Sequence, residues 1–272
     1  MVLINGKTGD KISIQDRGLQ YGDGVFETIA HRNNKAEFLE QHLSRLIEGC
    51  KVLSIAFEQI ETLREELERV FQSLEDQTAV IKIIITRGTG RRGYFSDNTE
   101  IPTRIISSHP FPSHPEQYQT EGVLLRFCEQ TLSTNSRLAS IKHLNRLEQV
   151  LARNEWDDPD IPEGIMSDDE DNIIEGTMSN IFIVEEGKLF TPVVTRAGIA
   201  GVMRAQVIQL ATRSGLSVQE RTITRRQLAE AEEVFVCNSI IGIWPVYAIS
   251  NKMYPVGFIT QFLQKALAEC DK

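Results

Sequence analysis

Apolar and polar residues recur with two different periods along the chain, and together these periods predict a mixed α/β fold. Amphipathic helices are predicted where apolar residues recur every three to four positions, at 38–53 and 60–74. The β-branched run at 79–86 has the length of a buried strand. Further strands and hairpins are predicted at 2–5 with 11–15, 25–29, 105–108, 123–127, 164–167 with 172–175, 180–184 with 188–191, 234–237 and 244–249, and short helices at 224–231 and 258–269.

A proline-rich stretch divides the chain into two parts. Three prolines fall between His109 and Pro115, and each removes a backbone donor and fixes φ, so regular structure cannot form there. We therefore predict an N-terminal domain over residues 1–115 and a C-terminal domain over residues 116–272. The acidic turn 168–171 lacks the ligand spacing and the glycine of a calcium loop, and is interpreted as a solvated hairpin tip.

Composition narrows the classes of function. A hydrophobic content of 41% is enough for a substantial core, whereas a net charge of −9 argues against binding to nucleic acid or to an anionic membrane. No apolar run approaches the roughly 20 residues that span a bilayer. The histidines show no metal-ligand spacing. The cysteines form no CxxC pair and are interpreted as reduced thiols of a cytoplasmic protein, at Cys50, Cys128, Cys237 and Cys270.

A lysine directly precedes a helical pattern near the middle of the chain. Leu144, Leu147, Val150 and Leu151 recur at helical spacing, which predicts a helix with one buried face, and Lys142 stands just before it. A lysine held in a partly apolar pocket loses some preference for its charge, and a neutral amine is a nucleophile that can form a Schiff base. On residue type alone, the alternative is a solvated lysine at a helix start.

Two glycine-containing stretches suit the binding of small anions. Residues 87–94, Arg-Gly-Thr-Gly-Arg-Arg-Gly-Tyr, form a cationic loop, the arginine loop. This loop could bind a carboxylate or phosphate, or could simply be exposed. The turn 198–204 opens a helix that runs to about Ser214, and free N–H groups at such a start favour a phosphate. The turn around Asp23 leads into a strand, where Asp23 could serve only as a cap.

Taken together, these stretches resemble the fold-type IV family of pyridoxal-phosphate enzymes, which includes D-amino-acid aminotransferases, branched-chain aminotransferases and aminodeoxychorismate lyases. The resemblance covers nearly the whole chain, and its motifs occur in the family's order at 21–27, 42–46, 142, 175–180 and 201–204. It implies an α+β or α/β fold with a smaller N-terminal α/β domain and a larger, β-barrel-like C-terminal domain that carries Lys142. It also implies a homodimer.

The resemblance assigns roles to individual residues. Lys142 matches the lysine that forms a Schiff base with pyridoxal 5'-phosphate, and Glu175 matches the carboxylate that keeps the pyridine nitrogen protonated. On helical spacing alone, Arg45 would be a surface residue. The resemblance instead implies contacts with the cofactor phosphate for Arg45, for the backbone N–H groups of Val202 and Met203, and for the Ser239 hydroxyl.

Substrate preference is implied by the arginine loop and the segment around the lysine. Arg92 aligns with the arginine that binds the substrate carboxylate in D-amino-acid aminotransferases, but Tyr94 stands where those enzymes carry a histidine. Residues 87–94 and 141–149 look most like the lyases of the family. The resemblance therefore implies conversion of 4-amino-4-deoxychorismate to 4-aminobenzoate and pyruvate in folate synthesis, with Lys142 as base and Lys142 or Thr28 as proton donor.

Three other functions stay open at this point. The first is a D-amino-acid or branched-chain aminotransferase, which would share Lys142, Glu175 and Arg45 with the lyase. The second is a cofactor-binding or regulatory homologue without turnover, and the third is a purely structural dimer. The third would leave the arginine loop without a purpose.

Overall fold

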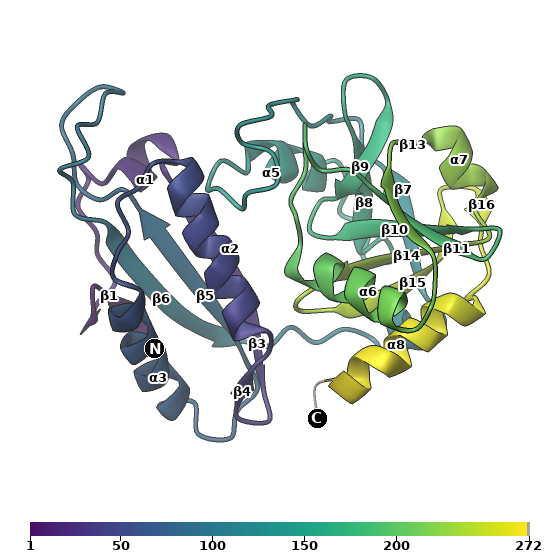
Figure 1. Cartoon of the computed structure of the whole chain (residues 1–272), viewed down its shortest axis with the longest axis horizontal. Coiled ribbons are helices and arrows are strands. Elements are labelled where there is room, and N and C mark those ends of the chain that lie inside the picture. The colour runs from purple at the N-terminus through teal and green to yellow at the C-terminus, as the bar shows by residue number, and fades with distance from the viewer. Residues whose placement is uncertain (271–272) are drawn as a thin grey trace. The chain divides into compact units, whose positions relative to one another are not determined.

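The chain folds into two compact units, each with a sheet and a hydrophobic core of its own (Figure 1). The computed structural model describes residues 1–270, and the expectation for the Cys270 thiol lies outside the described side chains. The first unit comprises Met1–Pro112 and Ile141–Asn145, and the second comprises Ser113–Ser140 and the chain from Arg146 onward.

The first unit is a six-stranded antiparallel sheet with α2 and α3 packed against it (Figure 1). The strand order is β2-β1-β6-β5-β3-β4. Alternate residues of β3 and β5 meet the apolar stripes of α2 and α3 in one buried core. The elements are β1 (Val2–Ile4), β2 (Lys7–Thr8), α1 (Arg17–Tyr21), β3 (Gly24–Arg32), β4 (Lys35–Ala36), α2 (Leu39–Val52), α3 (Ile60–Gln72), β5 (Ala79–Thr86) and β6 (Thr103–Pro110).

The segment Ile141–Asn145 pairs with the edge of β3 and for that reason belongs to the first unit. The Phe26 N–H donates to the Lys142 carbonyl at 2.9 Å, and the Leu144 N–H donates to the Gly24 carbonyl at 2.9 Å. The sequence-based division had placed Lys142 in the C-terminal domain. The structure corrects that placement, because backbone pairing with a strand more than a hundred residues earlier leaves no mark in local periodicity.

The second unit is a ten-stranded mixed sheet that curls, since β9 also lies against β10 and β11. The strand order is β12-β11-β10-β14-β15-β7-β8-β9-β13, with β16 paired to β15. Helices α6 and α8 pack against β14, and α8 also against β15. The elements are α4 (Gln117–Thr120), β7 (Val123–Phe127), α5 (Leu147–Arg153), β8 (Glu163–Ser167), β9 (Asn172–Gly176), β10 (Asn180–Glu185), β11 (Lys188–Pro192), α6 (Val202–Arg213), β12 (Val218–Arg221), β13 (Ile223–Thr224), α7 (Arg225–Glu230), β14 (Glu233–Asn238), β15 (Gly242–Ile249), β16 (Lys252–Met253) and α8 (Phe258–Cys270).

Three local expectations differ from the structure. Residues 11–15 form no strand, and β1 pairs instead with the short β2. Asp168 in the acidic turn is buried, and its carboxylate accepts the N–H groups of residues 170 and 172. The helix after Lys142 begins only at Leu147. The apolar side chains expected on its buried face are exposed, at 74% for Leu147, 50% for Val150 and 56% for Leu151.

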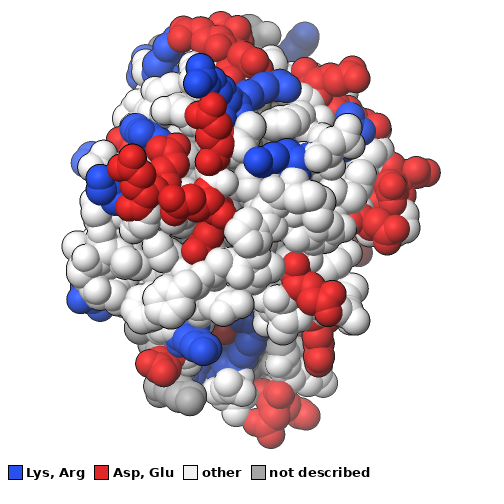
Figure 2. Space-filling view, turned by 90° about the vertical axis from the view of Figure 1, so that its right-hand side faces the viewer, with Lys and Arg blue, Asp and Glu red and all other residues white. Residues whose placement is uncertain are grey.

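The charges on the surface agree with the net charge of the chain, and the described cysteines are free thiols, as expected from their spacing. On the face shown in Figure 2, acidic side chains form several groups with basic side chains between them, as a net charge of −9 leads one to expect. Within residues 1–270, no helix is long and apolar enough to cross a membrane. The three described cysteines are buried free thiols, and burial raises the pKa of each to about 12 (Cys50, Cys128 and Cys237).

Candidate active site

Lys142 carries its amine to the Phe26 ring of β3. The Lys142 Nζ lies 4.4 Å from the centre of that ring, and the residue is half-buried. Phe26 and Thr28 are two positions apart on β3 and share one side of the sheet, opposite the side that faces the helix core. The structure thus places Thr28 on the side of β3 where Phe26 and the Lys142 amine meet.

A buried ionic network holds Arg45 in the first unit. The Glu27 carboxylate, fully buried, accepts Arg45 Nε at 2.7 Å and Arg45 Nη2 at 2.5 Å. Its Oε2 also lies 2.6 Å from His42 Nδ1. The Arg45 side chain is only 15% exposed, so the surface position inferred from helical spacing is wrong. The fork of the guanidinium is fixed by the carboxylate of a neighbouring strand.

The charges of this network follow from its burial. Burial disfavours the ionised form of Glu27, but the Arg45 charge and the hydrogen bonds from His42 and Arg45 outweigh it, and the pKa of Glu27 is lowered. Burial lowers the pKa of His42 in spite of Glu27, which favours the neutral imidazole, and an ionised Glu27 can then accept only from a protonated Nδ1. Its Nε2 has no hydrogen-bond partner among residues 1–270.

Glu175 lies at the end of β9 in the second unit and is buried. Its Oε2 accepts the Ile199 N–H at 2.8 Å and lies 3.4 Å from Asn180 Nδ2. The Asn180 amide also donates to the Ile199 carbonyl at 2.9 Å. Burial lowers the pKa of Arg146, and the nearby Glu175 charge acts against that shift. Glu175 is therefore a fixed carboxylate with a cation in its surroundings.

The start of α6 lies beside Glu175 and Asn180. Gly201 precedes the helix in an extended conformation and offers no side-chain cap. A Cβ at Gly201 would collide with the Asn180 amide oxygen, so a larger residue there would displace the Asn180 side chain. The first N–H groups of α6, those of Val202 and Met203, thus form the uncapped positive end of a twelve-residue helix.

Ser239 lies in the turn between β14 and β15. The Asn238 carboxamide oxygen accepts the N–H groups of Ile240 at 2.8 Å and Ile241 at 2.9 Å, which shapes this turn around Ser239. The Asn238 amide donates to the Met178 carbonyl at 3.0 Å. Because Asn180 pairs with Cys237 across β10 and β14, the Ser239 turn is anchored next to the Glu175 segment.

Glu163 supports this region and was missed from the sequence. It is fully buried on β8 and accepts Thr177 N, Thr177 Oγ1, Met178 N, Ser179 Oγ and its neighbour Gly164 N, at 2.5–3.0 Å. Burial raises the pKa of Glu163 despite these hydrogen bonds. A single carboxylate within an apolar strand pattern indicates that it is buried together with hydrogen-bond donors, but the sequence does not show which residues donate.

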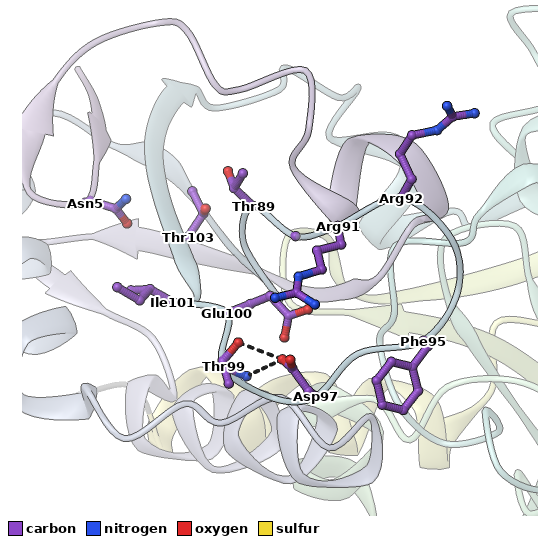
Figure 3. Close-up of a pocket in the computed structure, with 11 residues that line it drawn as sticks. Asn5, Thr89, Arg91, Arg92, Phe95, Asp97, Thr99, Glu100, Ile101 and Thr103 are labelled. Atoms are coloured by element: carbon purple, nitrogen blue, oxygen red, sulfur yellow. Dashed lines mark hydrogen bonds between the residues drawn. The ribbon is translucent and has the colours of Figure 1, made fainter.

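The arginine loop lines, together with Asn5 and residues 95–103, a half-open pocket of about 670 Å³ within the first unit (Figure 3). Arg91 points toward Asp97 and Glu100, whereas Arg92 points away from the other labelled side chains. Tyr94 is 87% exposed, and its ring meets the Tyr21 ring edge-on at a centroid distance of 5.5 Å. Tyr94 and Arg92 are thus both exposed, and Arg92 also lines the pocket.

Comparison with known proteins agrees with the resemblance found in the sequence. Residues 24–249 match the family described as amino-transferase class IV. The chain belongs to this family. It is 38% identical to the aminodeoxychorismate lyase of Vibrio harveyi, over 97% of this chain and 98% of that protein. It is 28% identical to the D-alanine aminotransferase of Bacillus licheniformis, over 98% and 95%.

The fold agrees as well. The crystal structure of the 4-amino-4-deoxychorismate lyase of Pseudomonas aeruginosa matches with a TM-score of 0.95 and 43% identity, over 99% of this chain and 98% of that one. The two-unit architecture expected from the resemblance is thereby confirmed. The family depends on pyridoxal phosphate.

The described residues fit such a cofactor. An amine (Lys142), a buried carboxylate suited to a protonated ring nitrogen (Glu175) and an uncapped helix start suited to a phosphate (Val202 and Met203) are all present. The structure groups Lys142, Thr28 and Arg45 in the first unit. It groups Glu175, the start of α6 and Ser239 in the second.

Proposed function

We propose that this protein is a pyridoxal-phosphate-dependent lyase that converts 4-amino-4-deoxychorismate to 4-aminobenzoate and pyruvate. The observation that carries the proposal is full-length similarity, at 38% and 43% identity, to two proteins named as lyases for this substrate. The segments that favour a lyase in the sequence, 87–94 and 141–149, lie within that similarity.

Each proposed residue has a chemical task. Lys142 would hold the cofactor, and its amine, when free, would remove the proton from the amine-bearing ring carbon of the substrate. The bound cofactor supplies a sink for the electrons released there, and Glu175 stabilises its ring in the protonated form. Lys142 or Thr28 returns a proton to the departing enolpyruvate.

Binding tasks fall to the remaining residues of the proposed site. Arg45, the N–H groups of Val202 and Met203, and the Ser239 hydroxyl bind the cofactor phosphate. Arg92 and Tyr94 bind a carboxylate of the substrate, which carries two. Both side chains are exposed and are therefore accessible to a substrate.

Two broader properties belong to the same proposal. We propose a homodimer, because the exposed apolar face of α5 (Leu147, Val150 and Leu151) needs a partner surface to leave water. Light scattering should give twice the 30.7 kDa mass of one chain, and the double variant Leu147→Glu, Leu151→Glu should shift the measured mass toward that of a single chain.

A cytoplasmic location is proposed from the reduced, buried thiols.

The test of the lyase uses the purified protein loaded with pyridoxal phosphate. Aminodeoxychorismate, generated enzymatically, is added while 4-aminobenzoate and pyruvate are followed. We expect both products in equal amounts, and we expect the visible absorbance of the bound cofactor and the turnover to be lost in Lys142→Ala. Lys82→Ala is the matched control, because its amine lies 5.4 Å from the same Phe26 ring and should leave the absorbance in place.

The alternative is an aminotransferase, and the full-length similarity to a D-alanine aminotransferase supports it. If D-alanine or a branched-chain amino acid with a keto acid turns over and aminodeoxychorismate does not, the aminotransferase replaces the lyase. If the wild type shows no cofactor absorbance that depends on Lys142, both proposals fail.

A further inference from the structure

The loop between β5 and β6, residues 87–102, is exposed at its tip but is held by buried charged side chains. Tyr94 and Phe95 are 87% and 82% exposed, and Arg91 and Arg92 are exposed too. Three charged side chains behind the tip are almost enclosed, with exposed fractions of 5% for Arg17, 10% for Arg87 and 14% for Asp23. The tip therefore owes its shape to these side chains more than to burial of its own.

Asp23 is the centre of this arrangement. Its Oδ2 accepts Arg17 Nε at 2.9 Å and Arg87 Nε at 2.8 Å, and its Oδ1 accepts Arg87 Nη2 at 3.1 Å. Burial works against ionisation of Asp23, but the hydrogen bonds and charges of Arg87 and Arg17 outweigh it and lower its pKa. One carboxylate thus orients two guanidinium groups, a larger task than capping a turn.

Arg17 connects Asp23 to the tip of the loop. Its Nη1 donates to the Gly93 carbonyl at 2.9 Å, and its Nη2 donates to the Tyr94 carbonyl at 3.0 Å. The guanidinium carbon lies 5.0 Å from the centre of the Tyr21 ring, and the Tyr21 hydroxyl accepts the Gly93 N–H at 3.2 Å. The backbone on both sides of Tyr94 is therefore fixed by one side chain.

Arg87 connects Asp23 to the far side of the same loop. Its Nη1 donates to Asn98 Oδ1 at 3.0 Å and to the Ser54 carbonyl at 2.7 Å. Its Nη2 also donates to the Leu53 carbonyl at 2.7 Å. The arginine thus anchors the returning half of the loop to the end of α2.

We propose that Asp23, Arg17 and Arg87 form a clamp that fixes residues 88–98, so that Arg92 and Tyr94 meet the substrate carboxylate in a set geometry. The clamp residues are positioning residues, since they act through the loop and do not touch the substrate. This rests on the proposed function, in which that loop binds the substrate. The stretch Tyr-Gly-Asp-Gly and the arginine loop, two separate patterns in the sequence, then serve one purpose.

Arg17→Lys tests the clamp in the full-length, cofactor-loaded protein, since one ammonium cannot replace a fork that reaches Asp23 and two carbonyls. Trypsin cleavage after Arg91 and Arg92, mapped by mass spectrometry, should become about tenfold faster. KM for aminodeoxychorismate should rise about tenfold with kcat within about twofold. Cofactor affinity should be unchanged. Arg226→Lys, which alters an exposed pair with Glu230 and keeps the number of tryptic sites, is the matched control.

A second variant keeps the test decisive if Arg17→Lys fails to fold. Asn98→Ala removes a contact of Arg87 from an exposed position and should change cleavage and KM in the same direction by a smaller factor. Equal cleavage in the wild type and both variants would overturn the clamp, whether or not the protein is a lyase. Faster cleavage with an unchanged KM in an active lyase would overturn its role in substrate binding.

Discussion

Glu27 in the first unit and Glu163 in the second are both fully buried carboxylates, yet their pKa values move in opposite directions. Glu27 is bonded to the guanidinium of Arg45 and to His42. Among the described residues, the donors to Glu163 are neutral: they are backbone N–H groups and hydroxyls of residues 164 and 177–179. Burial acts to raise both pKa values, and for Glu27 the charge of Arg45 together with the hydrogen bonds from His42 and Arg45 outweighs burial.

The difference shows two ways of building a site around a buried carboxylate. Glu27 uses its charge to fix the direction of another charged group, Arg45, which is proposed to bind the cofactor phosphate. Glu163 uses its acceptor capacity to fix the backbone of the turn 177–179, between Glu175 and Asn180. The first depends on a charge pair, and the second on the number of hydrogen bonds.

Glu27→Gln should produce the largest effect. It replaces the carboxylate that pairs with the nearly buried Arg45 guanidinium by a neutral amide, and removal of one partner from a buried ion pair typically costs about 3–5 kcal/mol. The free energy of unfolding, measured by urea denaturation of the protein without cofactor, should fall by that amount. Cofactor affinity should also weaken, because Arg45 loses its fixed direction.

Glu40→Gln is the matched control for this prediction. Glu40 also forms a double hydrogen bond to an arginine, Arg64, but at a surface position where its side chain is 67% exposed. Surface pairs of this kind contribute about 0–1 kcal/mol because water and salt screen them. Similar losses of unfolding free energy in Glu27→Gln and Glu40→Gln would contradict the view that burial determines how much the Glu27–Arg45 pair stabilises the protein.

The same two regions show how far the sequence could lead. The strand at 79–86 was predicted at its observed bounds, because an apolar β-branched run depends on local preference alone. Arg45 could not be placed by spacing, since its partner Glu27 comes from another element. The face formed by Leu147, Val150 and Leu151 shows the same limit: periodicity reveals an apolar face, but not the surface that covers it.

Glu163→Gln should produce an intermediate effect. The amide keeps one oxygen as an acceptor but turns the other into a donor, which opposes Met178 N–H and the Ser179 hydroxyl. Unsatisfied buried donors cost about 1–3 kcal/mol, so the urea midpoint should fall less than in Glu27→Gln. Ser179→Ala removes one of the five bonds and should cost less again. If Glu163→Gln lost as much stability as Glu27→Gln, the charge pair of Glu27 with Arg45 would contribute no more to stability than the neutral hydrogen bonds of Glu163.

The smallest effect is the pH dependence, and its sign separates the two carboxylates. The unfolded value for both is about 4.5. The folded pKa of Glu163 is raised, so the wild type gains stability relative to Glu163→Gln as pH falls from that value toward 4.5. The folded pKa of Glu27 is lowered, so its contribution to the stability of the fold is complete above pH 4.5 and is lost as the pH falls below 4.5.

His42, whose pKa is also lowered, destabilises the folded protein below pH 6.5. Because it does so in both the wild type and Glu163→Gln, its effect cancels in the difference between these two proteins. Urea denaturation at several pH values measures the difference in the free energy of unfolding between the wild type and each of the variants Glu163→Gln and Glu27→Gln. Each carboxylate changes this free energy by at most about 1.4 kcal/mol per pH unit. A wild-type advantage over Glu163→Gln that shrinks between neutral pH and 4.5 would show that Glu163 is stabilised as an anion, in the manner of Glu27.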